Sequence, residues 1–193
     1  MIKALARTYL SELKDDLDRI SLGDLDSIVH AIFEAYKKSK QVFVMGNGGS
    51  AATASHFACN ASHLNLGLKK GLKVLCLSDG VPTILAIAND RSHEEIFVEQ
   101  LRTLLNPGDV VIGISASGNS RNVIRAVEYA NRRRAISLAI TGFDGGRLAR
   151  IARFSIVVPG GDIKKIEDAH LILTHIVTHA LKSKIEGSRK RRP

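Results

Sequence analysis

The chain has 193 residues, of which 45% are hydrophobic and 24% are charged, as in an ordinary soluble protein of about one domain. No apolar run approaches the roughly 20 residues that span a bilayer, which argues against a membrane protein. Residues 1–7 lead into a charged amphipathic segment and not into a signal-peptide core, so we expect a cytoplasmic protein.

The formal net charge of +9 is unevenly distributed along the chain. Arg189, Lys190, Arg191 and Arg192 fall within residues 187–193, which we expect to form a disordered basic tail. The remaining charge, about +5, suits a protein that handles anionic small molecules. Three tyrosines, six phenylalanines and no tryptophan offer little stacking surface, so we do not expect nucleic acid as a partner. Binding of duplex DNA through the tail is an alternative, and a steep loss of affinity with salt would be its sign.

Two amphipathic helices are predicted ahead of the first strand. Residues 3–20 carry an apolar stripe that ends at Leu22-Gly23, and a second stripe runs over residues 24–39. Residues 1–40 therefore form an N-terminal helical hairpin within the same domain. Its apolar faces must cover the sheet or another subunit, so we expect this hairpin to take part in oligomerisation.

The first strand leads into a predicted anion site. The apolar run at residues 42–45 is a buried strand, Gly46-Asn47-Gly48-Gly49 ends it, and small residues from Ser50 onward begin a helix. The glycines let the backbone approach a ligand closely, and the unpaired N–H groups at the helix start point toward a phosphate. An ordinary strand-to-helix turn is the alternative interpretation, because the stretch matches neither a P-loop nor a dinucleotide fingerprint.

Strands and helices alternate along the rest of the chain. We predict strands at residues 73–78, 110–114, 136–140 and 155–158, and helices at residues 83–88, 94–105, 123–132, just after 144–146, and 163–185. This alternation predicts an α/β fold with a five-stranded parallel sheet and helices on both faces. Cys59 and Cys76 have no metal-like spacing, and we expect both to be buried free thiols.

Ligands of such sheets bind at the carboxyl ends of the strands. This rule places residues 46–50, 78–79, 115–120 and 141–142 around one crevice. Residues 115–120 offer three hydroxyls and a set of amides ahead of a helix, and are a second phosphate candidate that needs no lysine. A serine-rich turn is the alternative, but two such turns in one parallel sheet favour a phosphate site.

Five segments carry a resemblance to a known family. They are Gly46-Asn-Gly-Gly-Ser-Ala-Ala52, His56-Phe-Ala58, Ala86-Ile-Ala-Asn-Asp90, Gly113-Ile-Ser-Ala-Ser-Gly-Asn-Ser120 and Thr141-Gly-Phe-Asp-Gly-Gly146. In this order they resemble the sugar isomerase (SIS) domain family, and within it the sedoheptulose 7-phosphate isomerase (phosphoheptose isomerase) subfamily. The resemblance covers nearly the whole chain. It implies a three-layer, flavodoxin-like SIS domain at residues 41–186 and a homotetramer.

The resemblance also implies which residues contact a sugar phosphate. The expected substrate-binding residues are Asn47, Gly48, Gly49, Ser50, Asn60, Asp90, Ser115, Ala116, Ser117 and Ser120. His175 on the last helix falls where the isomerases carry a catalytic histidine. His170 matches a position that we interpret as structural. We expect that no cofactor is required.

Four positions depart from the family's pattern. Asn60 stands where the isomerases carry a catalytic glutamate, four residues after His56, and an amide cannot move a proton between adjacent carbons. Leu64 replaces an arginine near the substrate, Ala116 replaces a threonine of the phosphate loop, and Glu167 replaces a glutamine of the last helix. Binding is therefore expected to be retained, while the inherited pair of catalytic groups is broken.

Glu167 restores a carboxylate to the predicted cleft, and we expect it to share the acid and base roles with His175. His56, Glu167 and His175 are also a ligand set that could hold zinc, with coordination left open to substrate. A salt bridge between Glu167 and Lys164 is the simplest alternative.

The sequence is compatible with two kinds of function. The first is an aldose–ketose isomerase that acts on sedoheptulose 7-phosphate or a similar ketose phosphate. The second is a phosphosugar-binding or regulatory protein without catalysis, which would resemble the DnaA initiator-associating protein, a tetrameric relative without the isomerases' catalytic residues. The presence of His175 and Glu167 favours the enzyme.

Overall fold

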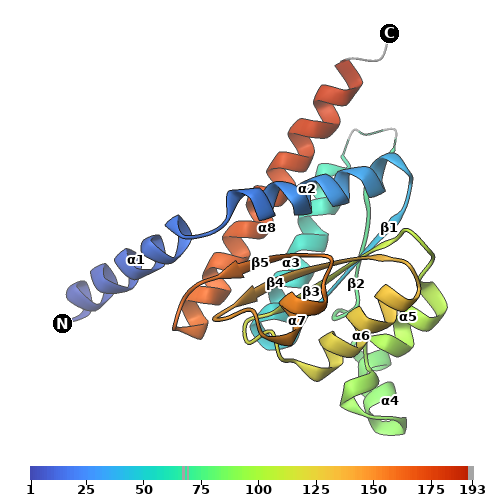
Figure 1. Ribbon diagram of the computed structural model, residues 1–193, viewed down its shortest axis with the longest axis horizontal. Coiled ribbons are helices and arrows are strands. Elements are labelled where there is room, and N and C mark those ends of the chain that lie inside the picture. The colour runs from blue at the N-terminus through green and yellow to red at the C-terminus, as the bar shows by residue number, and fades with distance from the viewer. Residues whose placement is uncertain (67, 69, 191–193) are drawn as a thin grey trace.

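Five parallel strands form one sheet, as the alternating pattern of the sequence predicted, and the structure gives their order as β2-β1-β3-β4-β5. The computed structural model describes residues 1–66, 68 and 70–190 (Figure 1). The strands are β1 (Gln41–Met45), β2 (Lys73–Cys76), β3 (Val110–Ser115), β4 (Ile136–Gly142) and β5 (Phe154–Val158). The helices of the described chain are α1 (Ile2–Asp18), α2 (Leu22–Lys37), α3 (Gly48–Leu64), α4 (Val81–Asp90), the 3-10 helix η1 (His93–Glu95), α5 (Val98–Leu104), α6 (Arg121–Arg132), α7 (Gly146–Ile151) and α8 (Ile163–Lys190).

Helices cover both faces of the sheet, because successive side chains of each strand point to opposite faces. Val42 and Val44 of β1 pack in one core with α2, α3 and α8. Phe43 and Met45 of the same strand pack in a second core with α5, α6 and α7. Buried strands without polar alternation are thus explained by two apolar cores, one on each side of the sheet.

The strand order brings two loops side by side at the carboxyl edge of the sheet. β1 pairs with β2 on one side and with β3 on the other, and Met45 lies opposite Gly113 in the parallel register. The chain therefore leaves β1 and β3 in adjacent positions, at the point where the strand order reverses. Such a switch point is where ligands bind in open parallel sheets.

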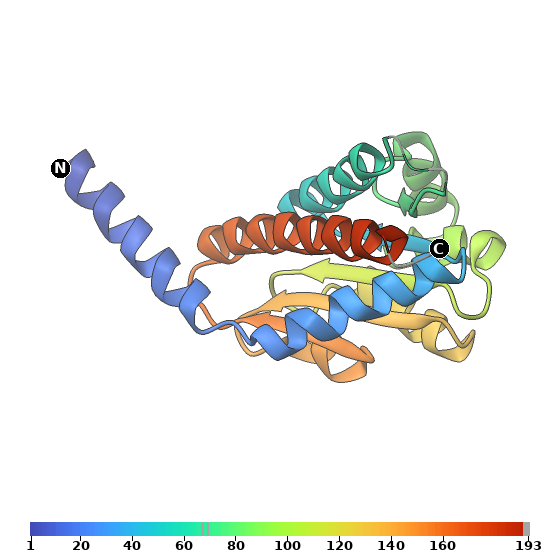
Figure 2. The ribbon, with the colours of Figure 1, turned by 90° about the horizontal axis from the view of Figure 1, so that it is seen from above.

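The two N-terminal helices behave differently. α2 buries an apolar face against the sheet, whereas the first half of α1 projects away from the body (Figures 1 and 2). Ile2, Leu5 and Leu10 of α1 are 77%, 72% and 64% exposed. Near its middle, α1 is joined to the start of α8, where the Tyr9 hydroxyl donates to Asp168 over 2.6 Å.

Helix boundaries differ from the sequence prediction at both ends of the chain. Ser21 caps α2 by accepting from the Asp24 N–H, so Gly23 lies inside α2 and does not end α1. α8 continues to Lys190 instead of ending near 185, and the Ser188 hydroxyl donates to the Ile185 carbonyl within the helix. The expected disordered tail at 187–193 therefore begins inside a helix, and residues 191–193 lie outside the described residues.

Two other predictions, one on the cysteines and one on the helix at residues 94–105, were only partly correct. Cys59 is exposed on α3 and Cys76 is buried, so only one of the two thiols is buried as expected. The predicted helix at 94–105 divides into η1 and α5. Within the described ranges, none of the helices combines the length and the apolar character needed to cross a bilayer.

Candidate functional site

Three serine hydroxyls converge where β3 ends and α6 begins. The Ser115 and Ser120 oxygens lie 2.9 Å apart, and those of Ser115 and Ser117 lie 3.5 Å apart. Ser120 is the N-cap residue of α6 but makes no side-chain cap bond, so its hydroxyl belongs to the serine cluster. Hydroxyls at the start of a 12-residue helix form a neutral cradle for an anion. We call residues 115–120 the serine loop.

The turn after β4 fixes the shape of the serine loop. Gly142 N–H donates to the Ala116 carbonyl over 2.9 Å, and Leu148 N–H donates to the Gly118 carbonyl over 2.8 Å. Gly118 has φ +63°, and a Cβ at this position would lie 2.1 Å from the Gly145 carbonyl oxygen. The backbones touch so closely that both loops need glycine, which explains why the two motifs occur together.

The loop after β1 is tied to its neighbours on both sides. Gly46 N–H donates to the Ser78 hydroxyl over 3.1 Å, and this hydroxyl donates back to the Gly46 carbonyl over 2.8 Å. The Asn47 amide exchanges two hydrogen bonds of 2.9 Å with the Asn122 amide on α6. Ser50 is buried under this loop and only 5% exposed. The predicted crevice thus gathers the ends of β1, β2, β3 and β4.

Glu167 lies over the start of α3. A Cβ built on Gly49 would be 2.5 Å from both carboxylate oxygens of Glu167, so the carboxylate occupies space that only glycine leaves free. Among the ion pairs of the described residues, none includes Glu167 or Lys164, which excludes the simple salt bridge as an explanation. The negative carboxylate of Glu167 occupies the positive end of the α3 dipole and would repel a phosphate there. The serine loop is therefore the better phosphate site.

His56 and His175 meet between α3 and α8. Their Nε2 atoms lie 2.8 Å apart, and the rings are in edge contact with centroids 5.0 Å apart. Both side chains reach solvent. At this distance one imidazole donates while the other accepts, so the pair can hold or pass on a proton.

The residues present do not fit the zinc site predicted from the sequence. Among the described residues no group of three or more His, Cys, Asp or Glu side chains could hold a metal ion. His56 and His175 meet, but Glu167 lies two helical turns before His175, about 12 Å along α8. The carboxylate is therefore held at Gly49, away from the histidine pair.

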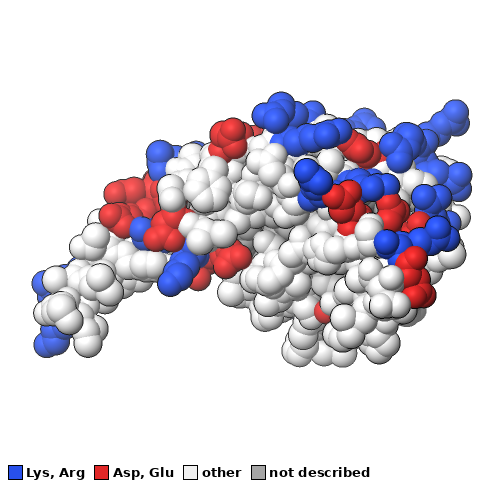
Figure 3. All heavy atoms as spheres, turned by 90° about the horizontal axis from the view of Figure 1, so that it is seen from below, with Lys and Arg blue, Asp and Glu red and all other residues white. Residues whose placement is uncertain are grey.

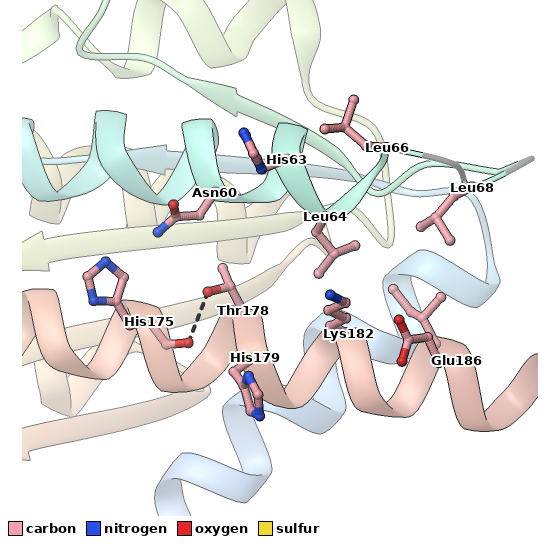
Figure 4. A pocket seen from close by; sticks show the side chains of 11 residues that line it. Asn60, His63, Leu64, Leu66, Leu68, His175, Thr178, His179, Lys182 and Glu186 are labelled. Atoms are coloured by element: carbon pink, nitrogen blue, oxygen red, sulfur yellow. Dashed lines mark hydrogen bonds between the residues drawn. The ribbon is translucent and has the colours of Figure 1, made fainter.

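A cavity of about 530 Å³ opens beside the histidine pair, between the second half of α3 and α8 (Figure 4). His175 and Asn60 face the same gap in this view, and Leu64 lies further along α3. The lining comprises Asn60, His63, Leu64, Leu66, Leu68, His175, Thr178, His179, Lys182, Ile185 and Glu186. Two of the positions that depart from the family's pattern thus line the cavity next to His175.

Sequence reasoning missed several of these lining residues. Thr178, His179 and Lys182 follow His175 at helical spacings of three, four and seven, and His63 follows His56 by seven. Residues at these spacings share one face of a helix. That stripe was the available signal, and only the helix-to-helix packing shows that it borders the cavity.

Two arginines near the crevice are already paired. Arg121, the first residue of α6, lies 3.0 Å from Glu94 of η1, and Arg147 after the β4 turn pairs with Glu128. Asp90, expected to bind substrate, is exposed at the end of α4 and accepts from the Asn89 amide. Lys and Arg gather mainly at the end of the molecule away from α1. A broad surface without charged side chains lies between that end and α1 (Figure 3). The serine loop therefore offers hydroxyls and backbone amides to an anion, without an unpaired arginine at Arg121 or Arg147.

His170 is fully buried on α8, as its structural interpretation requires. In the part of the chain that the structure describes, neither ring nitrogen has a hydrogen-bond partner of normal geometry, although the Thr141 backbone is close. Burial lowers the pKa of His170 from 6.5 to about 4, so the ring is neutral at physiological pH.

The fold and the serine loop define an SIS domain. The SIS domain model matches residues 8–142, and the chain belongs to this family. A phosphoheptose isomerase of Helicobacter pylori is 36% identical over 181 residues, covering 92% of this chain and 94% of the relative. One of Geobacter metallireducens is 36% identical over 166 residues, covering 86% and 88%. The solved phosphoheptose isomerase of Neisseria gonorrhoeae superposes with a TM-score of 0.88 at 29% identity, covering 95% of this chain and all of the other.

Proposed function

We propose that this chain is a phosphosugar isomerase that converts sedoheptulose 7-phosphate, or a similar ketose phosphate, into the corresponding aldose phosphate. The observation that carries the proposal is the serine loop in a chain whose relatives at 36% identity are named phosphoheptose isomerases. A phosphate fits this loop because hydroxyls and the start of α6 face the same point. The sugar then extends along α3 toward His175.

The chemistry requires a proton to move between two adjacent carbons. A base removes the proton next to the carbonyl, an enediol forms, and an acid returns a proton to the neighbouring carbon. Asn60 cannot act as the base, so the role falls to other groups. His175 is the acid–base group in this proposal, with His56 in contact at 2.8 Å, and Glu167 is the second group. Glu167 lies nearer the start of α3, so substrate must draw the two side chains together for both to act.

A protein that binds phosphosugars without turnover is the competing function. It is motivated by Asn60, an amide where the isomerases are expected to carry a carboxylate. The enzyme is favoured because relatives that match most of the chain are named phosphoheptose isomerases.

The assembly that we propose is a homotetramer in the cytoplasm. Zinc has no step in this mechanism, and an unchanged rate after treatment with a chelator is the expected result.

The decisive experiment is to incubate the protein with sedoheptulose 7-phosphate and follow aldose formation by NMR. The wild type should form the aldose, and His175→Asn should reduce the rate by about a hundredfold or more. Binding measured by calorimetry without any aldose would favour the non-catalytic protein. Failure to bind the phosphosugar at all would overturn both functions.

A further inference from the structure

Two asparagine amides connect the loop after β1 to the helix after β3. Asn47 Nδ2 donates to Asn122 Oδ1 and Asn122 Nδ2 donates to Asn47 Oδ1, each over 2.9 Å. The residues are 75 positions apart in the sequence. Asn122 is 2% exposed, and its Oδ1 also accepts from the Val123 N–H. A buried amide that is bonded at both ends has one orientation only.

The Asn47 side chain does not serve as an ordinary helix cap. Asn47 is the N-cap residue of α3, the position where asparagine usually accepts from the first turn, yet it makes no side-chain cap bond. Its amide is committed to Asn122 instead. Each amide has two hydrogens and two oxygen lone pairs, so Asn47 keeps one hydrogen and one lone pair. Because Asn47 is only partly buried, these remain accessible to a ligand.

We propose that Asn122 is a positioning residue: it holds Asn47 and the start of α3 at a fixed place beside the serine loop, so that one phosphosugar contacts both. The inference rests on the proposed function in that the ligand is a phosphosugar. The phosphate lies in the serine loop, and the Asn47 amide contacts a hydroxyl of the sugar. Asn122 acts through Asn47 and does not touch the ligand.

The position of Asn122 suits this role. It is the second residue of α6, so it moves with the serine loop that precedes that helix. Asn47 precedes α3 directly, so the amide pair joins the two helix starts that border the crevice. Ser78 holds Gly46 from the other side, and the loop after β1 is thereby fixed on two sides.

The test compares Asn122→Ala with Asn131→Ala. Asn131 lies near the other end of α6, donates to the Ile151 carbonyl over 2.8 Å and accepts from the Ser137 hydroxyl. Its loss also removes two structural hydrogen bonds, but far from the crevice. Calorimetry with sedoheptulose 7-phosphate should show at least about a tenfold weaker affinity for Asn122→Ala, and an unchanged affinity for Asn131→Ala. Inorganic phosphate, which needs only the serine loop, should bind all three proteins equally.

A double-variant cycle with Asn47→Ala separates positioning from general loss of stability. If Asn122 acts through Asn47, the double variant should bind the phosphosugar no more weakly than Asn47→Ala alone. Additive losses, or an equal loss in Asn131→Ala, would overturn the proposal. Should Asn122→Ala fail to fold, Asn122→Ser removes the contact with Asn47 while keeping a polar group. These experiments measure binding, so they test the positioning role of Asn122 independently of catalysis. A protein that binds the phosphosugar but does not turn it over would contradict the isomerase function only.

Discussion

His170 places a titratable ring in the core, and among the described residues neither ring nitrogen has a hydrogen-bond partner of normal geometry. The unfolded chain binds a proton near pH 6.5, whereas the folded chain resists it until about pH 4. The unfolded state therefore holds more protons between these values, and the free energy of unfolding falls as the pH drops through this window. The stability that depends on a neutral His170 is fully present only above pH 6.5.

Urea denaturation should expose this effect. Between pH 7.5 and 5.0 the wild type should lose about 2 kcal/mol more of its unfolding free energy than His170→Leu, whose apolar side chain cannot take up a proton. Other groups titrate equally in both proteins, so the difference isolates His170. Equal losses in the two proteins would show that the ring is solvated in the folded state.

Glu167 can be tested by the amide that the family carries at this position. If the carboxylate is the base, Glu167→Gln should reduce the turnover of sedoheptulose 7-phosphate by about a hundredfold, with little change in affinity. Glu186→Gln is a matched control, since Glu186 is a carboxylate on the same helix at the far part of the cavity. Undiminished turnover in Glu167→Gln would remove Glu167 from the mechanism and leave the histidine pair to supply both roles.

The serine loop is the part of the site that the proposal relies on most. Replacing both Ser117 and Ser120 by alanine removes hydrogen bonds to a dianion, each worth about 1.5–3 kcal/mol. Phosphosugar affinity measured by calorimetry should fall at least about tenfold, whereas Ser62→Ala on the surface of α3 should have no effect. An unchanged affinity in the double variant would place the phosphate elsewhere.

At the scale of elements, local patterns predicted what depends on local sequence. The apolar runs predicted all five strands, and the parallel arrangement brings the glycine and serine turns to one edge of the sheet. The boundaries that failed depend on single side chains, such as the Ser21 cap. The exposure of Cys59 could not be predicted, because small residues surround it on α3 and leave no apolar stripe that marks the buried face.

Contacts between distant elements could not be predicted from the sequence, for a different reason. The Asn47–Asn122 pair and the contact of Glu167 with Gly49 join residues far apart in the chain, so they depend on how α6 and α8 pack against α3. A helical stripe showed that Glu167 and His175 share one side of α8. It could not show that they contact α3 at two separate points, so that the three proposed metal ligands do not form one cluster among the described residues.

For the whole molecule, the unusual feature is the projection of α1. Its leucines at positions 5 and 10 stay exposed in a single chain, whereas α2 is buried against the sheet. Apolar surface of this kind is typically buried against a partner. A second copy of the chain is the partner that we propose, in line with the expected tetramer.

Light scattering at micromolar concentration should therefore give the mass of a tetramer. Leu5→Glu combined with Leu10→Glu should shift it to a smaller species while circular dichroism stays unchanged, because both side chains are exposed in the single chain. Lys14→Glu, an exposed change on the same helix, should leave the mass unaltered. A monomeric wild type would contradict the proposed assembly.

The contact between the serine loop and the β4 turn also affects how the gene can vary. Gly118, Gly145 and Gly146 all have positive φ, and a Cβ on any of them would lie within 3 Å of neighbouring atoms. Every single-base change of a glycine codon that alters the amino acid, short of a stop codon, introduces a side chain. In a population of random point mutants these codons should be depleted of all replacements, while Gly161 and Gly187, with open space around them, should vary freely.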